Sequence, residues 1–152
     1  MPTGYNGKIL RVNLTSGAIS EETPPEIVYR TYMGGSALSS YYLLKEQKPG
    51  VEPLGPENKL IFMSSVISGA PLPGLTRYTV AARSPLTGAF GEAEAGGFWG
   101  PELKMAGFDG VIVEGRAAKP VYLWIKDGKA EIRDASRIWG KDTGEAERLI
   151  RE

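Results

Sequence analysis

The chain has 152 residues with 18 basic and 18 acidic side chains, and it contains neither cysteine nor histidine. This length corresponds to one domain, residues 1–152, which can bury roughly 70% of its unfolded surface without help from a disulfide or a metal. The two zero counts exclude a disulfide framework, a thiolate metal or iron–sulfur site held by this chain, and a Ser-His-Asp triad.

Charge and hydropathy limit the kinds of partner that this chain is expected to bind. Because acidic and basic residues balance, a generally basic nucleic-acid-binding surface is not expected. No apolar run approaches the roughly 18 residues that a membrane span needs, and residues 1–5 lack the charged and then apolar order of a signal peptide. We therefore expect a cytoplasmic protein that binds neither nucleic acid nor membrane.

Alternating apolar residues, turn residues and helix-stop signals predict a mixture of strands and helices. In chain order, we first expect strands at 8–14 and 18–21, helices at 26–33 and 36–46, and strands at 59–66 and 77–82. A helix at 98–107, strands at 110–114, 121–126 and 129–133, and a helix from about 143 follow.

A weak internal repeat runs through this order. The opening hairpin and its helix are matched by a second hairpin and the terminal helix, and Asp127-Gly128 in the second hairpin suits a type I′ turn. The sequence therefore predicts an α+β fold of two similar hairpin-and-helix halves. The second half lacks the elements that follow the first helix, and we expect it to be truncated.

The centre of the chain is rich in glycine. Ten of the 20 glycines lie between Gly69 and Gly115, and Gly96 and Gly97 directly precede a predicted helix. Glycines before a helix N-terminus let an anion approach unpaired N–H groups, although simple chain reversal is the commoner explanation for such a pair. The motif is neither a Walker loop nor a dinucleotide fingerprint.

Two arginines and two glutamates lie in the same region. Arg77 and Arg83 are the only basic residues between Lys59 and Lys104, and the planar guanidinium of an Arg at a strand end can fork onto a phosphate or a fused heterocycle. The alternative is an arginine that lies at a strand end in solvent and binds no ligand. Glu92 and Glu94 would share one strand face, but two carboxylates alone make a poor magnesium site.

Several short motifs follow one another along the chain. They are Gly-Lys-Ile-Leu-Arg-Val-Asn-Leu at 7–14, Pro-Glu-Asn-Lys-Leu-Ile at 56–61, Thr-Arg-Tyr at 76–78, Ser-Pro-Leu-Thr-Gly at 84–88, Gly-Gly-Phe-Trp-Gly-Pro-Glu-Leu-Lys at 96–104 and Gly-Phe-Asp-Gly at 107–110. In this order they resemble the N-terminal domain of the tungsten-containing aldehyde:ferredoxin oxidoreductases, and the resemblance extends from about Gly4 to the last residue.

The resemblance implies a domain whose sheets form the base for a tungsten or molybdenum bis-pterin cofactor with a magnesium ion between the pterin phosphates. It implies that Arg77 and Gly96, with the adjacent Gly97, contact the pterin. It also implies that the backbone carbonyl of Glu94 helps to hold the magnesium. Known family members carry Asn at that position, so Glu94 indicates a different subfamily.

The resemblance further implies ferredoxin, an aldehyde and the remaining enzyme domains as partners. In the family a [4Fe–4S] cluster is held by cysteines of later helical domains, which this cysteine-free chain lacks. We expect the complete enzyme to oxidise aldehydes and this chain alone to be inactive. The alternatives are a module of a related tungsten enzyme, such as a benzoyl-CoA reductase subunit, and a non-catalytic scaffold with the same fold.

Overall fold

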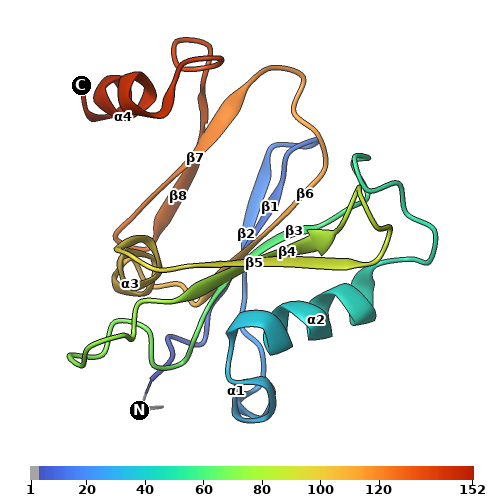
Figure 1. The fold of residues 1–152 in the computed structure, drawn as a ribbon, viewed down its shortest axis with the longest axis vertical. Helices are drawn as coiled ribbons and strands as arrows, with labels where there is room; N and C mark the ends of the chain where they lie inside the picture. The colour runs from blue at the N-terminus through green and yellow to red at the C-terminus, as the bar shows by residue number, and fades with distance from the viewer. Residues whose placement is uncertain (1–3) are drawn as a thin grey trace.

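The computed structural model describes residues 4–152, in which four helices and eight strands form an α+β fold (Figure 1). Residues 1–3, which entered the argument against a signal peptide, lie outside the described part. The elements are β1 (Ile9–Asn13), β2 (Ala18–Glu22), α1 (Glu26–Tyr32), α2 (Gly35–Glu46), β3 (Leu60–Ser64), β4 (Tyr78–Arg83), β5 (Phe90–Ala95), α3 (Trp99–Met105), β6 (Gly110–Glu114), β7 (Val121–Lys126), β8 (Lys129–Asp134) and α4 (Thr143–Arg151).

Six strands form one sheet in the order β2-β1-β6-β3-β4-β5, and β7 and β8 form a separate two-stranded sheet. Strands β1 and β6 run parallel, whereas all the other neighbours in the sheet are antiparallel. The parallel pair joins segments about a hundred residues apart in the chain, since Ile9 lies opposite Gly110. Strand β5 is an edge of the large sheet.

One face of the large sheet is covered by α1 and α2 (Figure 1). Strand residues alternate between the two faces of a sheet, so every second residue of the central strands points toward these helices. Each fully buried aromatic or aliphatic side chain in this core stabilises the fold by about 1.5–3 kcal/mol. The core residues are Ile9, Tyr29, Leu38, Tyr42, Leu43, Ile61, Met63, Ala81 and Ile112.

The opposite face carries a second core, which α3 and the β7–β8 hairpin cover. Leu10, Val12 and Val111 of the sheet pack with Leu103 and Phe108. The hairpin contributes the partly buried side chains Leu123, Ile125, Ala130 and Ile132. The hairpin therefore belongs to the same packed unit as the large sheet without sharing hydrogen bonds with its strands.

The structure confirms the α+β class and the order of the predicted elements, and it adds one strand, β5, that was not among them. Asp127 and Gly128 have φ values of 49° and 75°, as a type I′ turn requires. The two hairpin-and-helix halves differ in their surroundings, because β1–β2 lies within the large sheet and β7–β8 stands apart. Helix α4 has no buried residue, whereas α1 buries Tyr29.

Among residues 4–152, no helix has both the length and the apolar composition that a bilayer crossing requires.

Candidate functional site

Strands β4 and β5 bring the predicted site residues together at one end of the large sheet. The last pair of the β4–β5 ladder joins Tyr78 and Ala95. Arg77 immediately precedes Tyr78, and Gly96 and Gly97 immediately follow Ala95, so an antiparallel pairing places these residues side by side. The other predicted arginine, Arg83, pairs with Phe90 at the opposite end of the ladder and lies away from this group.

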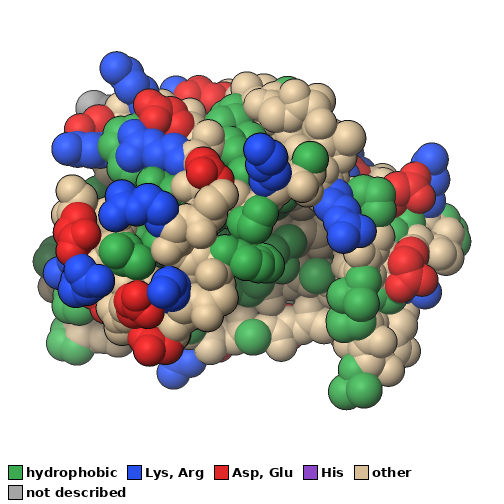
Figure 2. Space-filling model, turned by 90° about the horizontal axis from the view of Figure 1, so that it is seen from above, with side chains coloured by type: hydrophobic (Ala, Val, Ile, Leu, Met, Phe, Trp, Pro, Cys, Tyr) green, Lys and Arg blue, Asp and Glu red, His purple; other side chains and the backbone are tan. Residues whose placement is uncertain are grey.

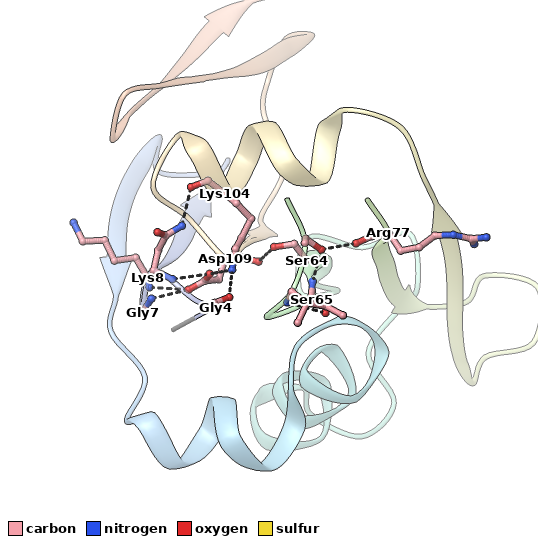
Figure 3. Close-up of polar contacts among 11 residues, drawn as sticks. Gly4, Gly7, Lys8, Ser64, Ser65, Arg77, Lys104 and Asp109 are labelled. Carbon is pink, nitrogen blue, oxygen red and sulfur yellow. Dashed lines mark hydrogen bonds and ion pairs between the residues drawn. The ribbon is translucent and has the colours of Figure 1, made fainter. Parts of the chain in front are cut away.

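The guanidinium of Arg77 is held by one weak contact. Its Nη1 lies 3.6 Å from a carboxylate oxygen of Glu94, and the two side chains are 66% and 54% exposed. An exposed ion pair of this kind contributes at most about 1 kcal/mol. Most of the donors of Arg77 are therefore available to an anionic ligand, and Figure 3 shows the side chain pointing away from Asp109.

Two glycines shape the backbone beside Arg77. Gly97 has a φ of 94°, and a side chain at this position would meet no protein atom within 4 Å. A Cβ at Gly100 would lie 3.1 Å from the carbonyl oxygen of Thr76, a tight contact, so the lack of a side chain lets the start of α3 lie close to the 76–77 segment. The close approach is therefore at Gly100, whereas the second of the paired glycines, Gly97, lies next to an unfilled space.

The loop before β4 is held by a buried serine that sequence reasoning missed. Ser68 is 6% exposed, and its hydroxyl donates to the carbonyl oxygen of Arg77 at 2.9 Å. The hydroxyl oxygen of Ser68 also accepts a hydrogen bond from the backbone N–H of Ser65 at 3.0 Å. Serine is common in loops rich in glycine and proline, so its residue type alone carries no signal for this role.

Asp109 forms a second polar centre behind the site (Figure 3). The residue is 2% exposed, and its carbonyl oxygen accepts hydrogen bonds from the backbone N–H of Ser64 at 3.0 Å and from the Ser64 hydroxyl at 2.6 Å. An Asp placed between a helix-ending Gly107 and a buried strand was a signal that sequence reasoning could have used. Its carboxylate accepts from the backbone N–H groups of Asn6 at 2.9 Å, Gly7 at 2.7 Å and Lys8 at 3.3 Å, and from Lys104 Nζ at 2.7 Å.

The carboxylates of Glu92 and Glu94 share the face of β5 that the sequence predicts, but they have different partners. Glu92 accepts a hydrogen bond from the Ser36 hydroxyl of α2, and Glu94 lies beside Arg77. No cluster of three or more Asp, Glu, His or Cys side chains suited to a metal occurs within residues 4–152. A cation here would therefore depend on backbone carbonyls and on oxygens of a ligand.

The site fits a phosphate-bearing group. It combines a guanidinium with free donors, an open space beside Gly97 and an exposed edge strand whose backbone groups have no partner on one side. Phosphate oxygens are bound by such planar, multiply donating groups and by accessible backbone.

Comparison with known proteins identifies the family. The family described as aldehyde ferredoxin oxidoreductase, N-terminal domain, matches residues 9–152. This chain belongs to the aldehyde ferredoxin oxidoreductase family. The recognition made from the sequence motifs is thereby confirmed.

Relatives within the family are several times longer than this chain. A tungsten-containing aldehyde ferredoxin oxidoreductase of Pyrococcus horikoshii is 50% identical over 149 residues, which cover 98% of this chain and 24% of the relative. An aliphatic sulfonate oxidoreductase, WOR-like subunit, of Pyrococcus furiosus is 38% identical over 139 residues, or 90% of this chain and 22% of that protein. The chain thus spans about a quarter of the length of the curated relatives that it matches.

A solved structure of the same family has nearly the same fold. The active site complex BamBC of benzoyl coenzyme A reductase, in complex with 1,5 dienoyl-CoA, superimposes with a TM-score of 0.96 at 38% identity. The match covers 99% of this chain and 23% of the other. The homologues of this chain are therefore domains of larger oxidoreductases, and the fold is the one that this family shares.

Proposed function

We propose that this chain is the cofactor-binding N-terminal module of a tungsten oxidoreductase that converts aldehydes to carboxylic acids and passes electrons to ferredoxin. Membership of a family of tungsten-containing enzymes supports the tungsten–pterin group. That group, when bound, supplies the redox chemistry, while the protein binds and orients it. The observation that carries the proposal is the exposed Arg77 guanidinium, with its single weak contact to Glu94, on the segment that lies beside the open backbone at Gly97.

Each predicted site residue has a distinct part in this proposal. Arg77 donates to phosphate or pterin oxygens, and Gly96 and Gly97 keep the adjacent backbone free of side chains. The backbone carbonyl of Glu94 holds the magnesium ion, a role that needs no particular side chain. The acid–base groups and the [4Fe–4S] cluster belong to the remaining domains of the enzyme, so this chain alone is inactive. We place the complete enzyme in the cytoplasm.

A second candidate substrate class comes from the solved relative. A benzoyl-CoA reductase complex shares the fold at 38% identity, whereas a tungsten-containing aldehyde ferredoxin oxidoreductase is 50% identical to this chain. This difference in sequence identity favours aldehydes over an aromatic acyl-CoA as the substrate class. Assays of the complete enzyme with aldehydes and with an aromatic acyl-CoA separate the two reactions, and a protein that kept only the scaffold function would turn over neither.

Replacement of Arg77 by Ala in the complete enzyme tests the site. We expect tungsten and pterin content, measured by mass spectrometry of metals and by pterin fluorescence after oxidation, to fall about tenfold, the effect of losing one or two charge-assisted hydrogen bonds. Because Arg77 is exposed, the thermal unfolding midpoint of cofactor-free protein should change little.

Glu94→Gln is the matched control for this experiment. It removes the ion-pair partner of Arg77 but keeps the backbone carbonyl, so cofactor content should equal or exceed that of the unmodified enzyme. Full cofactor content in the Arg77→Ala enzyme would overturn the proposed site.

A further inference from the structure

We infer that Ser68 is a positioning residue for Arg77, because its buried hydroxyl fixes the backbone from which the Arg77 guanidinium reaches the cofactor. The inference rests on the proposed function, since it assumes that Arg77 contacts the cofactor. It concerns a residue in the loop between β3 and β4 that neither the sequence motifs nor the family comparison assigns.

The hydroxyl of Ser68 bridges two backbone groups. It accepts a hydrogen bond from the N–H of Ser65 at 3.0 Å and donates one to the carbonyl oxygen of Arg77 at 2.9 Å. A serine hydroxyl has one donor and two acceptor positions, so both contacts form at the same time. Ser68 is only 6% exposed, and little water can replace either contact.

The bridge lies where the two strands separate. The β3–β4 ladder ends at the pair of Ser64 and Tyr78. In the same register the next rung would pair Ser65 with Arg77, but Ser65 instead forms an isolated bridge with Gly34. The Ser68 hydroxyl therefore links the strands one residue beyond their last ladder pair, at the residue that carries the guanidinium.

The end of β3 gives this link a rigid base. Ser64 donates to the carbonyl oxygen of Asp109 through both its backbone N–H and its hydroxyl, at 3.0 and 2.6 Å. Asp109 is in turn held by Lys104 and by the 6–8 segment (Figure 3). Hydrogen bonds from Ser64 to Asp109 and from Ser65 through Ser68 to Arg77, joined by the covalent link between Ser64 and Ser65, thus connect the backbone of Asp109 to that of Arg77.

Positioning matters here because the Arg77 side chain has little support of its own. It is 66% exposed, and its one ion-pair contact is the 3.6 Å approach to Glu94. A binding site that uses the several N–H donors of one guanidinium needs these donors held within about 0.5 Å of the productive geometry. Because two thirds of the side chain is exposed, the backbone of Arg77, which Ser68 holds, is its firmest support.

The test compares three serine variants and Arg77→Ala in the complete enzyme, purified anaerobically with its cofactor. Ser68→Ala removes the bridge, Ser68→Thr keeps a hydroxyl, and Ser39→Ala is the matched control. Ser39 is also buried and donates to a backbone carbonyl, that of Gly35 at 2.9 Å, but it lies within α2. The readouts are the rate of pterin release on dilution and the thermal unfolding midpoint.

We expect Ser68→Ala to release pterin about tenfold faster than the unmodified enzyme, and Ser68→Thr to release it at the unmodified rate. Ser39→Ala should leave the release rate unchanged, although its unfolding midpoint should fall about as much as that of Ser68→Ala. If Ser68→Ala does not yield folded enzyme, Ser68→Cys is used in its place, and faster release from it supports the inference. Unchanged release from the Ser68 variant alongside faster release from Arg77→Ala would overturn the role of Ser68 and leave the proposed function intact. Unchanged release from Arg77→Ala would overturn the proposed function, and the role of Ser68 with it.

Discussion

Asp109 shows how much a single side chain can organise in this protein. Its carboxylate is 3% exposed, and it faces Lys104, whose side chain is 11% exposed, at 2.7 Å. A buried carboxylate is stable only when its charge and lone pairs are satisfied. Here three successive backbone N–H groups and one ammonium satisfy it, and the N-terminal segment is thereby fixed beside α3.

Loss of the charge on Asp109 should destabilise the fold strongly. Asp109→Asn keeps the shape but leaves the Lys104 ammonium buried without its counter-ion, and removing one partner of a buried pair costs about 3–5 kcal/mol. Urea unfolding measures the change. The Lys104→Met, Asp109→Asn double variant should recover part of the loss, and a single-variant loss below about 0.5 kcal/mol would contradict this account.

Glu114 predicts a pH dependence of stability. The hydrogen bond from Lys59 Nζ is the main cause that lowers the pKa of Glu114 below its ordinary value of 4.5. A lowered pKa in the folded state stabilises the fold above the unfolded pKa, and this contribution is lost as pH falls through the folded value. We expect Glu114→Gln to cost about 1 kcal/mol at neutral pH, because water partly screens the pair.

The stability difference between Glu114→Gln and the unmodified protein should narrow as pH falls below 4.5. Urea unfolding at a series of pH values measures it. Glu147→Gln is the control, since this carboxylate on α4 is 62% exposed and its pair with Arg151 should contribute less than about 0.5 kcal/mol at any pH. A Glu114→Gln difference that stays constant with pH would refute the assignment.

At the scale of elements, the β7–β8 hairpin depends on its packing. A two-stranded sheet is marginally stable by itself in water, and this one has no hydrogen-bonded strand neighbour within the described chain. The apolar side chains on one face of the hairpin, among them Leu123 and Ile132, pack on the second core. The large sheet, in contrast, has four interior strands paired on both sides.

We expect the hairpin to open before the large sheet. In native-state hydrogen exchange, the amides of β7 and β8 should exchange faster than those of β3 and β6, which lie in the middle of the large sheet. Leu123→Ala should speed exchange in the hairpin selectively. Leu60→Ala, at a side chain that is 43% exposed on β3, is the control and should leave the hairpin unchanged. Equal protection in both sheets would show that they open as one unit.

At the scale of the whole molecule, large apolar side chains are exposed on the surface, one of them next to the proposed cofactor site. Phe98 is 85% exposed directly after Gly97, and Leu72 in the loop before β4 is 66% exposed. Figure 2 shows further hydrophobic side chains on the floor of a hollow in one face of the molecule. Large exposed apolar patches mark surfaces that other protein or ligand normally covers, and relatives about four times as long offer domains to cover them.

The isolated chain should therefore associate with itself. Gel filtration with light scattering across a range of concentrations should show a mass that rises with concentration, and Phe98→Ser should reduce this rise. Leu86→Ser, at a side chain that is 92% exposed in the turn between β4 and β5, serves as control and should have a smaller effect. A constant monomer mass at every concentration would contradict the expectation.

The order of strands and helices was predictable from sequence because it depends on local patterns. Alternation in 8–14, the Asp127-Gly128 turn and the glycines that end helices all act over a few residues. The family, too, was recognisable from short motifs in order. The pairing of β1 with β6 was not predictable, since contacts a hundred residues apart leave no local signal.

The sequence by itself determined the α+β composition, the absence of thiol and imidazole chemistry, and the candidates Arg77, Glu94, Gly96 and Gly97. Only the tertiary structure decided that these four lie together and that Arg83 does not, because antiparallel pairing of β4 and β5 sets which residues are neighbours. It also revealed Ser68, whose hydroxyl acquires its role from the point at which two strands diverge.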